Sequence, residues 1–288
     1  MIRVEKVNYI YGKGMPDERA ALKDVSLEIA DGSLTAVIGH TGSGKSTLMQ
    51  LFNALEKPSS GEVFVNGTEV TAKGANLKNL RQRVGLVFQY PEQQLFEETV
   101  YKDIAFGVKN MGFTGAELDE RVRAAAKLAG VKEKHLERSP FDLSGGQKRR
   151  VAIAGVLAMN PEVLILDEPA AGLDPKGRDS ILGVIKALHR ERPEMIIIFV
   201  SHSMEDVAKT AENVIVMNKG EIAMTGSVEE IFTRAEELEA MGLDVPQITR
   251  LCTRLKRSGM DIPSGIFTVE KAVREIYAAL NKEVGENA

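Results

Sequence analysis

The stretch LTAVIGHTGSGKST, residues 34–47, decides the fold, because it joins an apolar strand to a glycine-rich loop and the start of a helix. Residues 39–46 fit the pattern G-x-x-x-x-G-K-[ST] without exception. Glycines let successive backbone N–H groups converge on phosphate oxygens, and the following helix adds its positive end. With a strand expected over 34–38 and a helix over 46–55, the local context is the one such a loop requires. The stretch predicts an α/β protein that binds a nucleotide.

The side chains of this loop predict ATP and Mg²⁺ as ligands. Lys45 is expected to bridge the β- and γ-phosphates, and the Ser46 hydroxyl to ligate Mg²⁺. The other residues expected to cradle or contact phosphate are Gly39, Thr41, Gly42, Ser43, Gly44 and Thr47. A glycine-rich turn without a ligand is the alternative interpretation, and the full match to the pattern weighs against it.

A second informative stretch is VLILDE, residues 163–168, an apolar strand that ends in two carboxylates. Asp167 is expected in the Mg²⁺ coordination shell, and Glu168 to polarise or position the attacking water. Adjacent residues on a strand point to opposite faces, so the two acids need not share one role. The alternative interpretation is that the two acids cap the next helix. The phosphate-binding loop upstream weighs against that alternative.

The pentapeptide LSGGQ, residues 143–147, predicts a second anion site. A serine hydroxyl, two glycine N–H groups and a helix N-terminus all favour a bound anion. The residues expected to form this site are Ser144, Gly145, Gly146 and Gln147. The basic triplet that follows, residues 148–150, is interpreted as a solvated helix face in preference to a nucleic-acid patch.

Composition narrows the class of protein. A chain of 288 residues with 43% hydrophobic residues is large enough for one big core and a small appendage. A net charge of −4 gives no global electrostatic case for nucleic-acid binding. The single cysteine, Cys252, excludes an internal disulfide and fits a reducing compartment. No secretory signal and no stretch of ~20 apolar residues is visible, so a membrane role is expected only through partners.

Strands that alternate with helices predict a mainly parallel sheet with covered faces. An antiparallel part is expected near the N-terminus, where residues 4–11 and 25–29 alternate in polarity around a loop at 12–19. The other expected strands are residues 62–65, 84–88, 195–200, 214–217 and 221–224. The predicted division is a core over 1–226, with a helical subdomain at about 92–150, and a C-terminal helical extension over 227–288 that contacts a dimer mate or another partner.

The three motifs, in their order along the chain (residues 39–46, 143–147 and 163–168), resemble the ATPase subunits of ATP-binding cassette (ABC) transporters. The resemblance implies a P-loop NTPase core of the ABC type and ATP hydrolysis coupled to transport. It also implies that LSGGQ contacts the γ-phosphate held by a second subunit, and that residues 171–174 communicate across that dimer. Gln89 would reach Mg²⁺ or the lytic water, and His202 the γ-phosphate. The implied catalytic set is Glu168, His202, Gln89 and Lys45. Tyr11 would stack on adenine, with Tyr9 as the second candidate.

A narrower resemblance rests on FQYPEQQLF, residues 88–96, which is similar to the ATPase subunits of energy-coupling factor (ECF) transporters. Residues 144–154 and GLDVP, residues 242–246, are similar to the same family. The long loop at 12–19 most resembles the second of its two paralogous ATPases, often called A2 or A-prime. The alternatives are the ATPase of another ABC importer class, or a soluble ABC ATPase that acts on DNA or ribosomes.

The ECF resemblance implies membrane partners at the cytoplasmic face of the cell membrane. A second ECF ATPase would complete a heterodimer. The dimer would dock on a transmembrane coupling (T) subunit, which carries a substrate-binding membrane (S) subunit for a vitamin or a metal ion. Glu92, Glu97 and Glu98 are candidate counterparts to arginines of the coupling subunit. A solvated acidic helix end is an equal alternative for these three residues.

Overall fold

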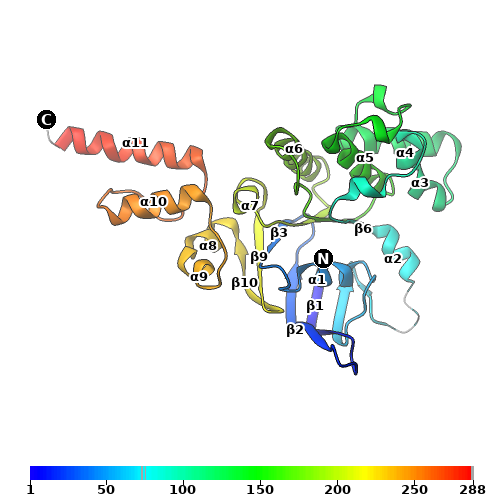
Figure 1. The fold of residues 1–288 in the computed structure, drawn as a ribbon, viewed down its shortest axis with the longest axis horizontal. Helices are drawn as coiled ribbons and strands as arrows, with labels where there is room; N and C mark the ends of the chain where they lie inside the picture. The colour runs from blue at the N-terminus through cyan, green and yellow to red at the C-terminus, as the bar shows by residue number, and fades with distance from the viewer. Residues whose placement is uncertain (73, 75, 287–288) are drawn as a thin grey trace.

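Two β-sheets share the helix α1 (Lys45–Phe52) in the computed structural model, which describes residues 1–72, 74 and 76–286 (Figure 1). The larger sheet has the spatial order β10 (Glu221–Ser227), β9 (Asn213–Asn218), β3 (Leu34–Ile38), β8 (Ile196–Val200), β7 (Val163–Asp167) and β6 (Val84–Val87). The smaller sheet has the order β2 (Arg19–Ile29), β1 (Ile2–Tyr11), β4 (Ser60–Val65) and β5 (Thr68–Glu69). Strands β9, β3, β8, β7 and β6 run parallel, whereas the smaller sheet is antiparallel. The predicted fold class is therefore confirmed.

The central strands are buried on both faces because helices cover the larger sheet from two sides. In β7, Leu164 and Leu166 enter one apolar cluster, while Val163 and Ile165 enter the other. The alternation follows from the period of two along a strand. It explains why these strands read as continuous apolar runs in the sequence.

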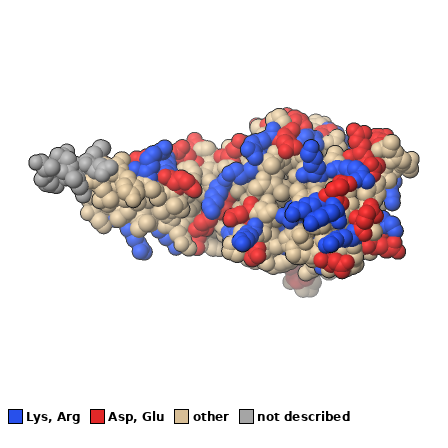
Figure 2. Space-filling view, turned by 90° about the horizontal axis from the view of Figure 1, so that it is seen from above, with Lys and Arg blue, Asp and Glu red and all other residues tan. Residues whose placement is uncertain are grey.

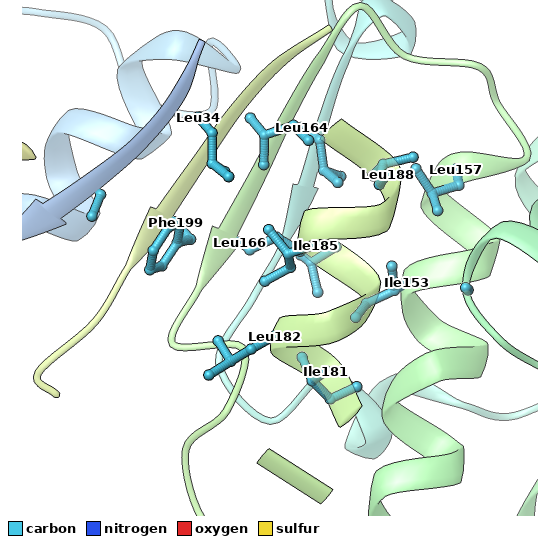
Figure 3. Close-up of a cluster of buried hydrophobic side chains, with 14 of the residues drawn as sticks. Leu34, Ile153, Leu157, Leu164, Leu166, Ile181, Leu182, Ile185, Leu188 and Phe199 are labelled. Atoms are coloured by element: carbon cyan, nitrogen blue, oxygen red, sulfur yellow. The ribbon is translucent and has the colours of Figure 1, made fainter. Parts of the chain in front are cut away.

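Helix α6 (Pro175–Glu191) lies along one face of this sheet. Its start is specified locally, because the Asp174 side chain accepts the Gly177 N–H and Pro175 occupies the first helical position. Figure 3 shows the contact of α6 with the strands and with α5 (Gly145–Leu157). The buried side chains labelled there are Leu34, Leu164, Leu166 and Phe199 from the strands, Ile181, Leu182, Ile185 and Leu188 from α6, and Ile153 and Leu157 from α5.

A helical layer of α3 (Val100–Asn110), α4 (Gly115–Leu128) and α5 packs beside the larger sheet (Figure 1). Three short 3₁₀ turns join it: η1 (Pro91–Gln94), η2 (Glu133–His135) and η3 (Pro140–Asp142). Helix α5 continues past residue 150, because Val151, Ile153 and Leu157 are buried against the core. The division of the chain at 92–150 stays a prediction.

The C-terminal helices pack in two groups. Side chains of α8 (Val228–Thr233) and α9 (Ala235–Ala240) join the large apolar cluster through Phe232 and Leu238. A separate cluster around Cys252 holds α10 (Gln247–Arg257) and α11 (Val269–Glu286), which reach away from the sheets. Figure 2 shows this tapering end and the interspersed acidic and basic side chains of one face. The predicted 227–288 extension stays a prediction, and its residues 287 and 288 lie outside the described part.

Some expected boundaries differ from the structure. Helix α1 ends at Phe52 and not at Leu55, because Ala54 adopts a left-handed φ of 55° and the Asn53 amide donates to the Val84 carbonyl. The strand β5 and the helices α2 (Leu77–Arg83) and α7 (Met204–Thr210) were not predicted, since short elements carry little periodicity. Among the described residues, no helix is both long enough and apolar enough to cross a bilayer.

We predict that Ile185→Ala lowers the free energy of unfolding by about 2–5 kcal/mol, because a fully packed side chain is lost from the α6 contact. The matched control is Gly183→Ala on the same helix, where an added Cβ meets nothing within 4 Å. That variant is expected to raise stability by up to about 1 kcal/mol through helix propensity. Urea denaturation of both variants measures the difference, and equal effects would contradict the packing shown here.

Candidate functional site

The loop between β3 and α1 is held close to neighbouring backbone. A Cβ at Gly39, whose φ is 151°, would lie 2.3 Å from the Met217 carbonyl oxygen of β9. A Cβ at Gly44, whose φ is 101°, would lie 2.6 Å from the Ala21 carbonyl oxygen of β2. Only glycine fits both positions, so the loop can pass this close to the backbone of β9 and β2.

The polar side chains inside this loop are buried, and one of them has no hydrogen-bond partner among the described residues. The buried Lys45 ammonium donates to the carbonyls of Gly39 and His40 at 2.7 and 2.8 Å. Burial lowers the pKa of Lys45, while Glu168 and Asp167 act in the opposite direction. The Ser43 hydroxyl is buried without a hydrogen-bond partner among the described residues. A buried polar atom of this kind is costly unless a ligand completes it, so the loop fits a phosphate group.

The predicted metal ligands lie together next to the loop. The Ser46 hydroxyl donates to Asp167 Oδ2 at 3.1 Å, and both residues line a cavity of about 370 Å³ with Gln89. Burial raises the pKa of Asp167, although Ser46, Lys45 and His202 lower it. A hydroxyl, a carboxylate and an amide oxygen are donors that suit Mg²⁺.

Glu168 and His202 meet in the same cavity. Their side chains approach to 2.6 Å between Glu168 Oε1 and His202 Nε2. Burial raises the pKa of Glu168, and the His202 charge opposes that shift. Glu168 also has a left-handed φ of 50°, a strained conformation that surrounding structure must maintain. A carboxylate with a raised pKa accepts a proton more readily at neutral pH.

Tyr11 and Tyr9 differ in exposure. Tyr11 is 41% exposed, and its hydroxyl lies 3.0 Å from Thr47 Oγ1 in the loop. Tyr9 is buried and donates its hydroxyl to Glu56. Its ring packs edge-on against Tyr11 with 4.7 Å between the centroids. Of the two, Tyr11 alone has an open ring beside the loop, and its role in stacking on adenine stays a prediction.

The LSGGQ residues line a different cavity, of about 560 Å³. The Ser144 N–H donates to Gln147 Oε1 at 2.9 Å, which fixes the start of α5. Residues Gly172, Leu173 and Asp174 line the same cavity. Among the described residues, the lining of this cavity and that of the Lys45 cavity have no member in common. The LSGGQ residues therefore do not line the Lys45 cavity of their own chain, although a third cavity is lined by Glu168 and His202 together with Gly172 and Leu173.

The interpretation of residues 148–150 as a solvated face is wrong for Arg149. Its side chain is 1% exposed and binds both oxygens of Glu92, at 2.9 and 2.6 Å. A guanidinium is buried only where such partners compensate the loss of water. Glu92 is partly buried and already paired with Arg149, and its assignment as a counterpart to a partner's arginine stays a prediction. The next residue, Arg150, donates to the Ser180 hydroxyl at 2.6 Å.

His40 makes a contact that was not predicted from the sequence. Its Nε2 lies 2.8 Å from the Met241 carbonyl oxygen, so the loop touches the segment after α9. Gly242 has a φ of 78°, and a Cβ there would lie 3.0 Å from His40 Nε2. The GLDVP stretch that begins at Gly242 was the available signal, but it says nothing about which residue it meets.

Comparison with known proteins gives close relatives over nearly the whole chain. Residues 22–171 match the family described as ABC transporter. The energy-coupling factor transporter ATP-binding protein EcfA2 of Caldanaerobacter subterraneus is 54% identical over 279 residues, 97% of each chain. The EcfA2 protein of Clostridium tetani is 52% identical over 283 residues, 98% of each chain.

Solved structures have the same fold. CbiO1 from Clostridium perfringens, part of the ABC transporter complex CbiONQ, superposes with a TM-score of 0.75 at 39% identity, covering 90% of this chain and 96% of CbiO1. A dimeric ATP-binding cassette in a post-hydrolysis state, bound to ADP and Pi, has a TM-score of 0.69 at 29% identity, covering 79% of this chain and 99% of that cassette.

We predict that Asp167→Asn raises the thermal stability of the nucleotide-free chain at neutral pH. Burial raises the pKa of Asp167, so above the unfolded pKa the unfolded state binds fewer protons and wild-type stability falls as pH rises. The advantage of the variant should shrink as pH drops toward about 4, where the carboxyl protonates in both states. Melting temperatures of both chains from pH 4 to 8 test this, and a pH-independent difference would refute it.

Proposed function

The chain belongs to the ABC transporter family as an ATP-hydrolysing subunit of the energy-coupling factor type, and we propose that a second cassette completes its ATP site. The resemblance predicted from residues 88–96 is thereby confirmed, and the soluble alternative is set aside. The observation that carries the proposal is that the LSGGQ residues line a cavity of their own and none of them lines the cavity that holds Lys45. The dimeric neighbour bound to ADP and Pi supports the same arrangement.

The loop half of the site would bind ATP and Mg²⁺. Lys45 and the loop N–H groups would hold the phosphates, Thr47 would add a hydroxyl, and Tyr11 would stack on adenine. Ser46, Asp167 and Gln89 would hold Mg²⁺ through their oxygen atoms. When bound, the metal ion would supply positive charge to the phosphate oxygens.

Glu168 would accept a proton from the attacking water through its carboxylate. Its raised pKa suits that role, since a base is most effective when its pKa lies near the working pH. His202 Nε2, 2.6 Å from Glu168 Oε1, would orient the carboxylate and reach the γ-phosphate. The two side chains would thus act as one unit at the end of β7 and β8.

The other half of each site would come from the second cassette. The Ser144 hydroxyl, the N–H groups of Gly145 and Gly146, and the N-terminus of α5 would face the γ-phosphate held by the opposite chain. ATP would then bind the closed pair more tightly than the open pair and shift the equilibrium toward closure. An isolated chain would bind ATP and hydrolyse it slowly.

The partners would be a second ECF ATPase, a transmembrane coupling subunit and a substrate-binding membrane subunit, with a vitamin or metal ion as cargo. The ECF name of the relatives and the CbiONQ complex of the structural neighbour support this assignment. The chain would then lie at the cytoplasmic face of the membrane. Glu97 and Glu98 remain candidate counterparts for a basic partner, because Glu98 is 81% exposed and pairs only with the exposed Lys102 among the described contacts.

We predict that Glu168→Gln preserves ATP binding and lowers kcat by at least about 100-fold, because a general base contributes at least that factor. Phosphate release by the assembled complex measures kcat, and calorimetry measures ATP affinity. Size-exclusion chromatography with ATP should show a longer-lived dimer. Glu191→Gln, at the exposed end of α6, serves as the matched control. Turnover at the normal rate would remove Glu168 from the mechanism.

We predict that reversing the charge at Glu97 and Glu98 to lysine weakens assembly with the coupling subunit while ATP binding survives. These carboxylates lie outside the Lys45 cavity, so only the docking surface changes. Co-purification from membranes measures assembly. Reversal of both Glu191 and Glu221, exposed residues of α6 and β10, gives the same change in net charge and is the control. Unchanged co-purification of the Glu97/Glu98 variant would count against this surface.

A further inference from the structure

The buried Arg149 lies where the helical layer meets the larger sheet. We propose that Arg149 is a positioning residue for hydrolysis: it ties the LSGGQ helix, the turn after Gln89 and the backbone after Glu168 into one rigid unit. The proposal rests on the proposed function, since it takes Glu168 as the base.

The guanidinium bonds to two segments besides its own helix. Nε and Nη2 donate to the two oxygens of Glu92, in the 3₁₀ turn η1 that follows Gln89. Nη1 donates to the carbonyl of Pro169 at 3.0 Å and to that of Ala171 at 2.7 Å. Arg149 itself lies in the α5 helix, which starts at the LSGGQ loop. Each of the three segments directly adjoins a residue of the proposed ATP site.

The contact pattern requires an arginine. A guanidinium carries five N–H donors in a planar fork, which allows a bidentate bond to a carboxylate and further bonds to carbonyls at the same time. A lysine ammonium has three donors from a single atom and cannot reproduce that geometry. Because the side chain is 1% exposed, separating it from Glu92 would leave a buried charge without its counter-ion. Segments joined in this way move together.

A second set of contacts links the same segments. The Tyr90 ring lies so close to Gly172 that a Cβ there would be 3.2 Å from Cε1 of the ring. The guanidinium of Arg149 stands 5.9 Å from the centre of that ring. The turn after Gln89 is therefore fastened to residues 169–172 both through Arg149 and directly through Tyr90.

The backbone that Arg149 holds is the one that carries Glu168. Glu168 has the strained φ of 50°, and its carbonyl accepts the N–H of Ala171 at 3.1 Å. Arg149 donates to the carbonyls of Pro169 and Ala171, two residues of this turn. Arg149 thereby fixes the turn that presents the base, and a displacement of η1 is transmitted to it. Arg149 does not line the Lys45 cavity, so the loop half of the site is expected to bind ATP without it.

The test compares Arg149→Lys, Glu92→Gln and the double variant in the assembled complex, with Arg123→Lys, an exposed arginine of α4 paired with Asp119, as matched control. Arg149→Lys should lower kcat by about 10- to 100-fold, because a misplacement of about 1 Å costs up to 100-fold. The ATP affinity of the isolated chain should stay within about twofold, since Arg149 does not line the cavity that holds Lys45, and in the complex the loss should appear in kcat more than in KM. The double variant should be no slower than Arg149→Lys alone, because both changes break one unit.

If the buried Arg149→Lys variant is unstable, Glu92→Gln still tests the positioning role. Glu92 lies nearer the surface, and glutamine has nearly the same shape as glutamate. A normal kcat for both single variants, additive effects in the double variant, or a raised KM with kcat unchanged would each overturn the positioning role. Absence of ATP hydrolysis by the wild-type complex would refute the proposed function instead, so the two failures are distinguishable.

Discussion

Close approach between the phosphate-binding loop and the backbone of two neighbouring strands is the constraint on which the rest of the structure depends. Gly39 lies against β9 and Gly44 against β2, with no room for a Cβ at either position. The loop is therefore held between the larger and the smaller sheet, at the point where α1 begins. A rigid frame of this kind orients the N–H groups before any ligand arrives, which reduces the cost of binding.

The same frame explains how distant residues converge. The carboxyl ends of parallel strands meet at one edge of a sheet, and ligands bind in the crevice outside that edge. Strand β3 leads into the loop, β7 into Asp167 and Glu168, β8 toward His202, and β6 toward Gln89. Buried faces on both sides of the sheet keep the strands in register. The site thus inherits its geometry from the core.

A buried ion pair connects the helical layer of α3, α4 and α5 to the larger sheet. The Arg149 guanidinium is buried between the helical layer and the sheet. Glu92 and two backbone carbonyls compensate the loss of its hydration. The LSGGQ cavity lies beyond this contact, apart from the loop cavity. In the proposed dimer ATP would be both the substrate and the bridge between the two chains, and the angle between the helical layer and the sheet would set how Ser144 is presented.

The sequence by itself determined the strand–loop–helix unit, the paired carboxylates, the mainly parallel sheet and the family, because each depends on local pattern. The short α2 and α7 carried too little pattern to be predicted. Tertiary structure alone decided which charged side chains are paired: Arg149 looks like a surface residue in the sequence but is buried, and the partly buried Glu92 neutralises it. It also decided that Tyr9 is buried while Tyr11 is open, and that His40 meets Met241. Such outcomes depend on contacts between residues far apart in the chain, which local periodicity does not encode.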